Sequence, residues 1–88
     1  MPLMAGMLTP DQLARLDAAR GAEWDRLFLT FMIQHHRGAL AMLDDLFDSY
    51  GAAQGDEMFK IASDIGADQR SEIDRMQRML RDLVFDSP

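Results

Sequence analysis

Two adjacent histidines interrupt an otherwise apolar pattern, and an imidazole can bind a metal ion or form hydrogen bonds. His35 and His36 lie within residues 23–50, a proline-free stretch whose apolar residues recur at three- and four-residue spacing. Gln69 and Glu72 interrupt a second stripe of this kind. Burying such groups without partners costs on the order of several kcal/mol. We therefore expect the four side chains to satisfy each other or to hold a ligand.

The break between the two stretches predicts that these side chains meet. Residues 51–55 include two glycines, and so short a connection makes the flanking helices antiparallel neighbours. If the hairpin folds about Ala53, positions 35 and 36 lie opposite 71 and 70, between Gln69 and Glu72. Met32 lies one turn before the histidines, and its opposite position is next to Met76, so thioether sulfur is expected at the same level.

These residue types indicate a metal site. Imidazole with thioether favours copper, Cu(I) especially, and imidazole with carboxylate would suit zinc as the second choice. Adjacent histidines point about 100° apart on a helix, so each serves a different seam, or the pair brackets a site that another chain completes. The candidate ligands are His35, His36, Met32, Glu72, Gln69 and Met76.

A metal-free interpretation stays open beside this one. In it His35 donates a hydrogen bond to Glu72 and His36 bonds Gln69, and the buried network fixes the helix register of a structural or interaction module. Methionine on a helix stripe is also common as core filler. An enzyme is not expected, because the sequence offers no nucleophile beside a base and no cofactor motif.

Composition excludes further classes. The 88 residues contain no cysteine, which removes disulfides and thiolate metal sites, and a net charge of −6 argues against nucleic acid and anionic lipid as partners. No apolar stretch approaches the roughly 20 residues of a membrane span, so we expect no membrane insertion. The sequence shows no signal-peptide pattern.

The expected fold is all-α: a single domain over residues 9–84, in which a short helix precedes a long antiparallel helical hairpin. Thr9, Pro10 and Gln12 form a capping box, and Gly21 fits a helix C-terminal cap. Residues 1–8 are expected to be a flexible, Met-rich lead-in, and 85–88 a frayed tail. The predicted helices cover about 10–19, 23–50 and 56–83.

The helix over 23–50 is apolar on two adjacent stripes, which a single neighbour cannot cover. One stripe contains Trp24, Phe28, Phe31, His35, Ala39, Met42 and Leu46, and the other contains Leu29, Ile33, His36, Leu40, Leu43, Phe47 and Tyr50. We therefore predict that two chains pair into a four-helix bundle.

The sequence also resembles a known family. Met32 to His36, followed by Gly38-Ala39 and Met42 and then by a Gln-x-x-Glu-Ile-x-x-Met string from Gln69, is similar to the bacterial domain-of-unknown-function family 305, defined by its His-His motif. The similarity runs from about residue 8 to residue 83.

This resemblance implies a ferritin-like helical fold, a periplasmic or secreted location and copper binding in some members. The motif positions that carry over are Met32, His35, His36, Met42, Gln69, Glu72 and Met76. Such proteins usually contain two copies of the helix pair, whereas this sequence contains one. A homodimer would then imitate the missing first helix-pair repeat.

Overall fold

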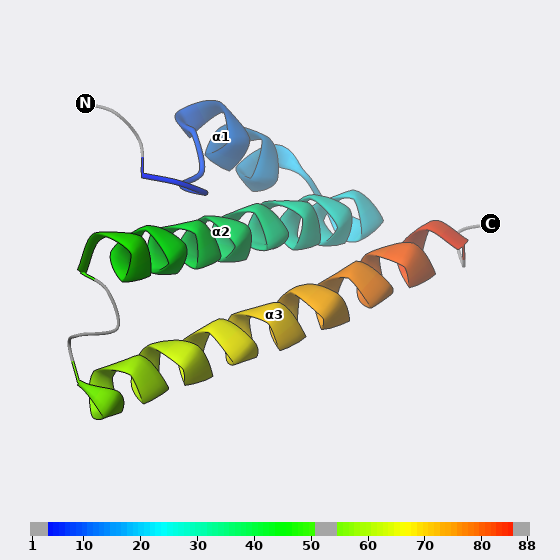
Figure 1. Ribbon diagram of the computed structural model, residues 1–88. Helices are drawn as coiled ribbons and strands as arrows, with labels where there is room; N and C mark the ends of the chain where they lie inside the picture. Colours follow the sequence, from blue (N-terminus) through cyan, green and yellow to red (C-terminus); the bar gives the residue numbers. More distant parts are fainter. Residues whose placement is uncertain (1–3, 51–54, 86–88) are drawn as a thin grey trace.

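Three helices account for almost all of the described chain. The structure is a computed structural model that describes residues 4–50 and 55–85, in which helix α1 covers Pro10–Ala18, α2 covers Gly21–Tyr50 and α3 covers Asp56–Phe85. The described residues form no strand. Helices α2 and α3 run antiparallel, and α1 lies on the side of α2 that faces away from α3 (Figure 1). The all-α hairpin with a short preceding helix is confirmed, whereas the pairing of two chains stays a prediction.

The start of α1 follows the predicted capping box. The backbone N–H of Gln12 donates to the Thr9 hydroxyl over 3.1 Å, and the Thr9 N–H donates to Gln12 Oε1 over 2.9 Å. These two bonds satisfy donors that a helix start otherwise leaves unpaired. Pro10, the first helical residue, has no N–H to satisfy.

The turn from α1 to α2 differs from the prediction. Gly21 has the expected positive φ of 63°, but it opens α2, and extended Ala19 caps α1 with its N–H bonded to the carbonyl of Arg15. The predicted C-terminal cap at Gly21 is therefore wrong. At the other end, α3 continues through Phe85, which the prediction had placed in a frayed tail, and residues 86–88 lie outside the described part.

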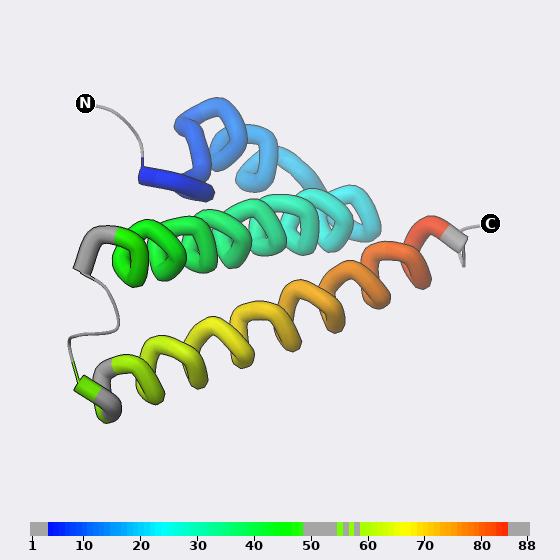
Figure 2. Tube along the Cα trace, viewed as in Figure 1, coloured from blue at the N-terminus to red at the C-terminus, as the bar shows by residue number. Residues whose placement is uncertain are grey.

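The packing produces a thin layer of helices. Among the described residues, the buried apolar side chains are Ala19, Leu29, Phe31, Ile33 and Ile73. Phe31 packs toward α1, where the Arg15 guanidinium lies 6.0 Å from its ring centroid. Near the hairpin end, the rings of Phe47 and Phe59 are 5.5 Å apart. The molecule measures 52 × 32 × 14 Å, so one dimension is little more than one helix diameter. Figure 2 shows the three helices spread side by side, with α2 between α1 and α3.

The described part of the N-terminal lead-in, residues 4–8, packs against α2. The Met7 N–H donates to the Met4 carbonyl over 3.0 Å, which closes a turn that crosses α2 at Gly38. A Cβ on Gly6 would lie 2.6 Å from the Gln34 carbonyl oxygen and 2.7 Å from Gly38 Cα. A Cβ on Gly38 would collide with the Ala5 carbonyl. Two glycines are therefore needed where these backbones cross.

Within residues 4–50 and 55–85, no helix combines the length and the apolar character that crossing a membrane requires.

A candidate metal centre

His36 is held in one orientation by its own helix. Its Nδ1 lies 2.8 Å from the carbonyl oxygen of Met32, four residues earlier in α2. A carbonyl only accepts hydrogen bonds, so Nδ1 carries the hydrogen and donates it. The remaining nitrogen, Nε2, is therefore the one available to a proton or a metal ion. This backbone bond to the far ring nitrogen is the arrangement that orients histidine ligands in metalloproteins.

Nε2 of His36 contacts Glu72 Oε2 across the interface between α2 and α3. The His36 side chain is only 12% exposed, whereas that of Glu72 is 59% exposed. Because Nδ1 already donates, the contact requires a proton on Nε2 or on the carboxyl group, or a cation that both atoms bind. An ion pair with so exposed a carboxylate contributes only about 0–1 kcal/mol to stability. The contact between His36 and Glu72 therefore adds little to stability, and both side chains are available as metal ligands.

His35 is exposed, contrary to the expectation that both imidazoles lie in the interior. Its ring centroid is 6.2 Å from that of His36, and the two planes meet at 68°. The cause is helical geometry, because consecutive residues point about 100° apart and His36 occupies the inward position. His35 is therefore turned out of the α2–α3 interface and exposed at its side in the single chain.

Gln69 lies at the expected level but without the expected partner. Its Oε1 is buried and has no hydrogen-bond partner. The predicted metal-free network assigned Glu72 to His35 and Gln69 to His36, and this pairing is wrong. The partner of His36 lies two residues further along α3 than the predicted opposite position, 70. That offset leaves Gln69 with an unused lone pair beside the histidine–glutamate level, and such a group is costly unless something else binds it.

Two methionines lie one turn from this level. Met32 precedes His36 by one turn and Met76 follows Glu72 by one turn, so the antiparallel register places both on the same side of the pair. Both side chains are half-buried. Met42, the remaining family-motif methionine, is 42% exposed.

The described residues offer ligand types that suit a copper ion, but they do not enclose one within a single chain. An oriented imidazole, a carboxylate and an orphan carbonyl oxygen come from two facing helices, with thioethers one turn away. Within the described residues, no three His, Cys, Asp or Glu side chains converge closely enough to hold a metal. A site on this level therefore needs further ligands beyond His36 and Glu72.

Gln34 has a role that the sequence analysis missed. It forms a reciprocal amide pair with Gln12 of α1: Gln12 Nε2 donates to Gln34 Oε1 over 2.8 Å, and Gln34 Nε2 donates to Gln12 Oε1 over 3.1 Å. This pair ties α1 to α2 directly beside His35 and His36. The available signal in the sequence was a polar residue in the capping box, Gln12, and another in the long helix, Gln34.

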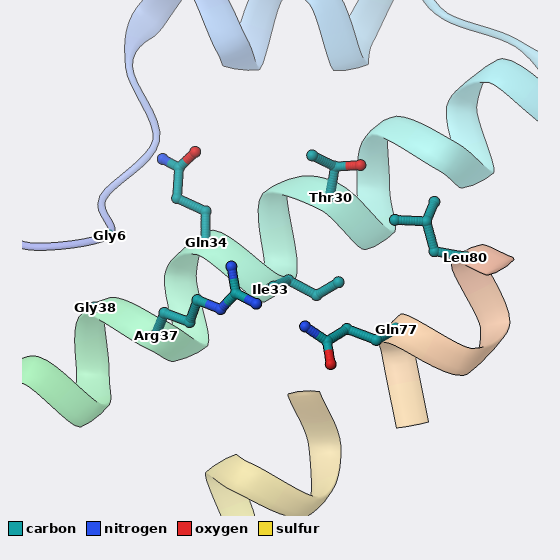
Figure 3. Close-up of a pocket in the computed structure, with 8 residues that line it drawn as sticks. All are labelled: Gly6, Thr30, Ile33, Gln34, Arg37, Gly38, Gln77 and Leu80. Atoms are coloured by element: carbon teal, nitrogen blue, oxygen red, sulfur yellow. The ribbon is translucent and has the colours of Figure 1, made fainter. Parts of the chain in front are cut away.

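A pocket of about 650 Å³ lies between the N-terminal turn, α2 and α3. Figure 3 shows Gln77 pointing from α3 toward Ile33 of α2, with Arg37 beside them. Its eight lining residues include no histidine, methionine or carboxylate, so this pocket is separate from the His36–Glu72 level.

Comparison with known families identifies the chain. The sequence model of the family described as a domain of unknown function (DUF305) matches residues 1–80. The chain belongs to the DUF305 family. No curated protein and no solved structure gave a match. The DUF305 match covers every residue of the candidate metal centre, from Met32 to Met76.

Proposed function

We propose that this DUF305 domain is a non-enzymatic copper-binding protein whose centre is built on His36 and Glu72. One observation carries the proposal: the Nδ1 bond to the Met32 carbonyl leaves Nε2 as the free ring nitrogen, and Nε2 faces the Glu72 carboxylate. Bound copper would take the lone pair of Nε2 in place of a proton, with Glu72 as its anionic partner.

The neighbouring groups favour copper over zinc. Met32 and Met76 supply thioethers at the adjacent turn, and thioether is a soft ligand that suits Cu(I). Gln69 contributes an oxygen with no other partner. Zinc would use the imidazole and the carboxylate but gains nothing from thioethers. A periplasmic or secreted location, proposed from the family resemblance, would suit a copper-handling role.

A second candidate is a purely structural polar layer. The observation that favours it is the direct contact between His36 and Glu72, which needs no ion if one proton lies between them. In that case the layer helps to set the register of α2 against α3, and loss of His36 would lower stability without affecting any metal.

Titration of the 88-residue protein with Cu(I) and with Cu(II) separates the two candidates. We expect the wild-type protein to bind copper, and His36→Ala to weaken binding by about 10-fold or more, because it removes the oriented nitrogen. The matched control is Arg37→Ala, which changes the next residue, an exposed one, and should leave the affinity unchanged. Met76→Leu should weaken Cu(I) more than Cu(II), whereas Met4→Leu, which changes an exposed thioether in the N-terminal turn, should weaken neither.

Absence of copper binding by the wild-type protein, or unchanged affinity in His36→Ala, would contradict the proposal. A fall in thermal stability in His36→Ala together with unchanged copper affinity would support the structural alternative.

A further inference from the structure

One side of the α2–α3 hairpin carries an exposed apolar face that His35 and Glu72 interrupt at its centre. Its exposed members on α2 are Trp24, Phe28, Met42 and Leu46, and those on α3 are Ile61, Ile65 and Met79. We call these seven residues the apolar face. His35 lies seven residues after Phe28 and seven before Met42, and Glu72 lies seven after Ile65 and seven before Met79. Seven residues make about two helical turns, so each polar residue lies at the centre of its stripe.

The two stripes lie on the same side of the hairpin. His35 immediately precedes the inward-facing His36, and Glu72 immediately precedes the buried Ile73. Each is therefore turned from the α2–α3 interface by about 100° in the same sense along its own helix. Because the helices are antiparallel, the same sense of rotation leads to the same side of the layer.

The molecule is too thin to bury this face by itself. Its radius of gyration is 16.0 Å, whereas a compact domain of this length has about 12 Å. Its accessible surface is 6738 Å², whereas a folded monomer of 10.0 kDa exposes about 5,200 Å². The excess over the whole molecule, about 1,500 Å², is large enough to include the roughly 800 Å² per partner that a standard interface buries.

We propose that a second copy of this chain covers the apolar face and completes the copper centre with its own His35. Fourteen residues of α2 precede His35 and fourteen follow His36, and Glu72 lies within two residues of the middle of α3. A two-fold axis through the centre of the face therefore places the apolar ends of the two copies against each other. It also places the level of His35 and Glu72 in one copy against the same level in the other. Because a second copy is identical, its apolar face has the same length as the face that it would cover.

The same symmetry supplies the missing ligand. If the two-fold axis is parallel to the helices, α2 of one copy packs on α3 of the other. Equivalent residues of the two copies then lie at the same position along the axis. His35 then meets the partner's Glu72, an imidazole opposite a carboxylate. Each centre would consist of His36 and Glu72 from one copy and His35 from the other, so the dimer holds two centres. The copper-binding part of this inference rests on the proposed function.

Sedimentation equilibrium of the wild-type protein at micromolar concentration tests the interface. We expect a dimer of about twice the 10.0 kDa chain mass. Ile65→Glu places a charge in the apolar face and should give a monomer that remains helical by circular dichroism. The matched control, Ala67→Glu, adds the same charge to an exposed position of α3 about 200° around the helix, and should stay dimeric. A wild-type monomer, or a dimer unaffected by Ile65→Glu, would overturn the proposal.

Subunit mixing tests whether the centre is shared. His35→Ala and His36→Ala chains, each weakened alone by about 10-fold or more, are refolded together and titrated with copper. In a mixed dimer, the His35→Ala chain supplies His36 and Glu72 and the other chain supplies His35, so one complete centre forms and wild-type affinity returns at a fraction of the sites. No recovery on mixing, with normal binding by the wild type, would overturn the shared centre and leave the proposed function standing. Absence of copper binding by the wild type would overturn both.

Discussion

At the scale of single residues, His36 and Gln69 differ in how their polar atoms are satisfied. His36 uses one nitrogen on its own backbone and presents the other to Glu72. Gln69 Oε1, one turn from Glu72, is buried and unpaired. A structural network would satisfy its members, because a partly satisfied buried layer is less stable than an apolar one. The orphan oxygen therefore favours a ligand-binding role for this level.

The substitution Gln69→Leu distinguishes a ligand-binding level from a structural network by the sign of its effect on the free energy of unfolding. Removing an unpaired buried carbonyl should raise the free energy of unfolding of the metal-free protein by about 1 kcal/mol. The same change should weaken copper binding, because one candidate ligand is lost. Urea denaturation with and without copper measures both effects. Gln77→Leu, at the other half-buried glutamine of α3, is the control and should change stability by less than about 0.5 kcal/mol. Destabilisation of the metal-free protein by Gln69→Leu alone would favour the structural network.

At the scale of elements, the N-terminal turn is attached to α2 by backbone contact. Gly38 lies inside a 30-residue helix, where glycine costs about 1 kcal/mol relative to alanine, and it leaves space for the Ala5 and Gly6 backbone. Gly66 of α3 is different, because the nearest atoms to a Cβ there belong to side chains: the movable Arg70 guanidinium at 3.3 Å and Leu43 at 3.8 Å. The two helical glycines should therefore respond oppositely to alanine.

We expect Gly38→Ala to lower the free energy of unfolding by about 1–2 kcal/mol, because the rigid backbone of residues 5 and 6 must be displaced. The Met7 amide should also lose its protection from hydrogen exchange. Gly66→Ala should instead raise the free energy of unfolding by about 0.5–1 kcal/mol through better helix propensity. Urea denaturation of both variants measures the difference. A change of the same sign in both would contradict the assigned role of the Gly6–Gly38 crossing.

The helices could be predicted from the sequence because their signals are local. The capping box at Thr9 and the long apolar periods of α2 and α3 each arise within a few residues. The partner of His36 could not be predicted in the same way, because it depends on how α3 slides along α2, and a two-residue offset exchanges one neighbour for another. The contact of Gly6 with Gly38 depends on a chain crossing between distant segments, which no local pattern encodes.

At the scale of the whole molecule, the polar level at the middle of two long helices is the central feature. The single layer of helices leaves His35 exposed and turns His36 toward α3, where it contacts Glu72. In the proposed dimer, His35 would instead contact a second copy. In the proposed dimer, this division would account for the finding that no three His, Cys, Asp or Glu side chains converge in the described part of one chain. Oligomeric state and copper binding are therefore expected to depend on the same surface.

The most direct test is a crystal of the full 88-residue protein grown with copper and measured at the copper absorption edge. We expect an anomalous peak within coordination distance of His36 Nε2 and the Glu72 carboxylate, with His35 of a second chain beside it. A crystal in which His36 still contacts Glu72 directly and the anomalous signal is absent, or lies on other side chains, would contradict it.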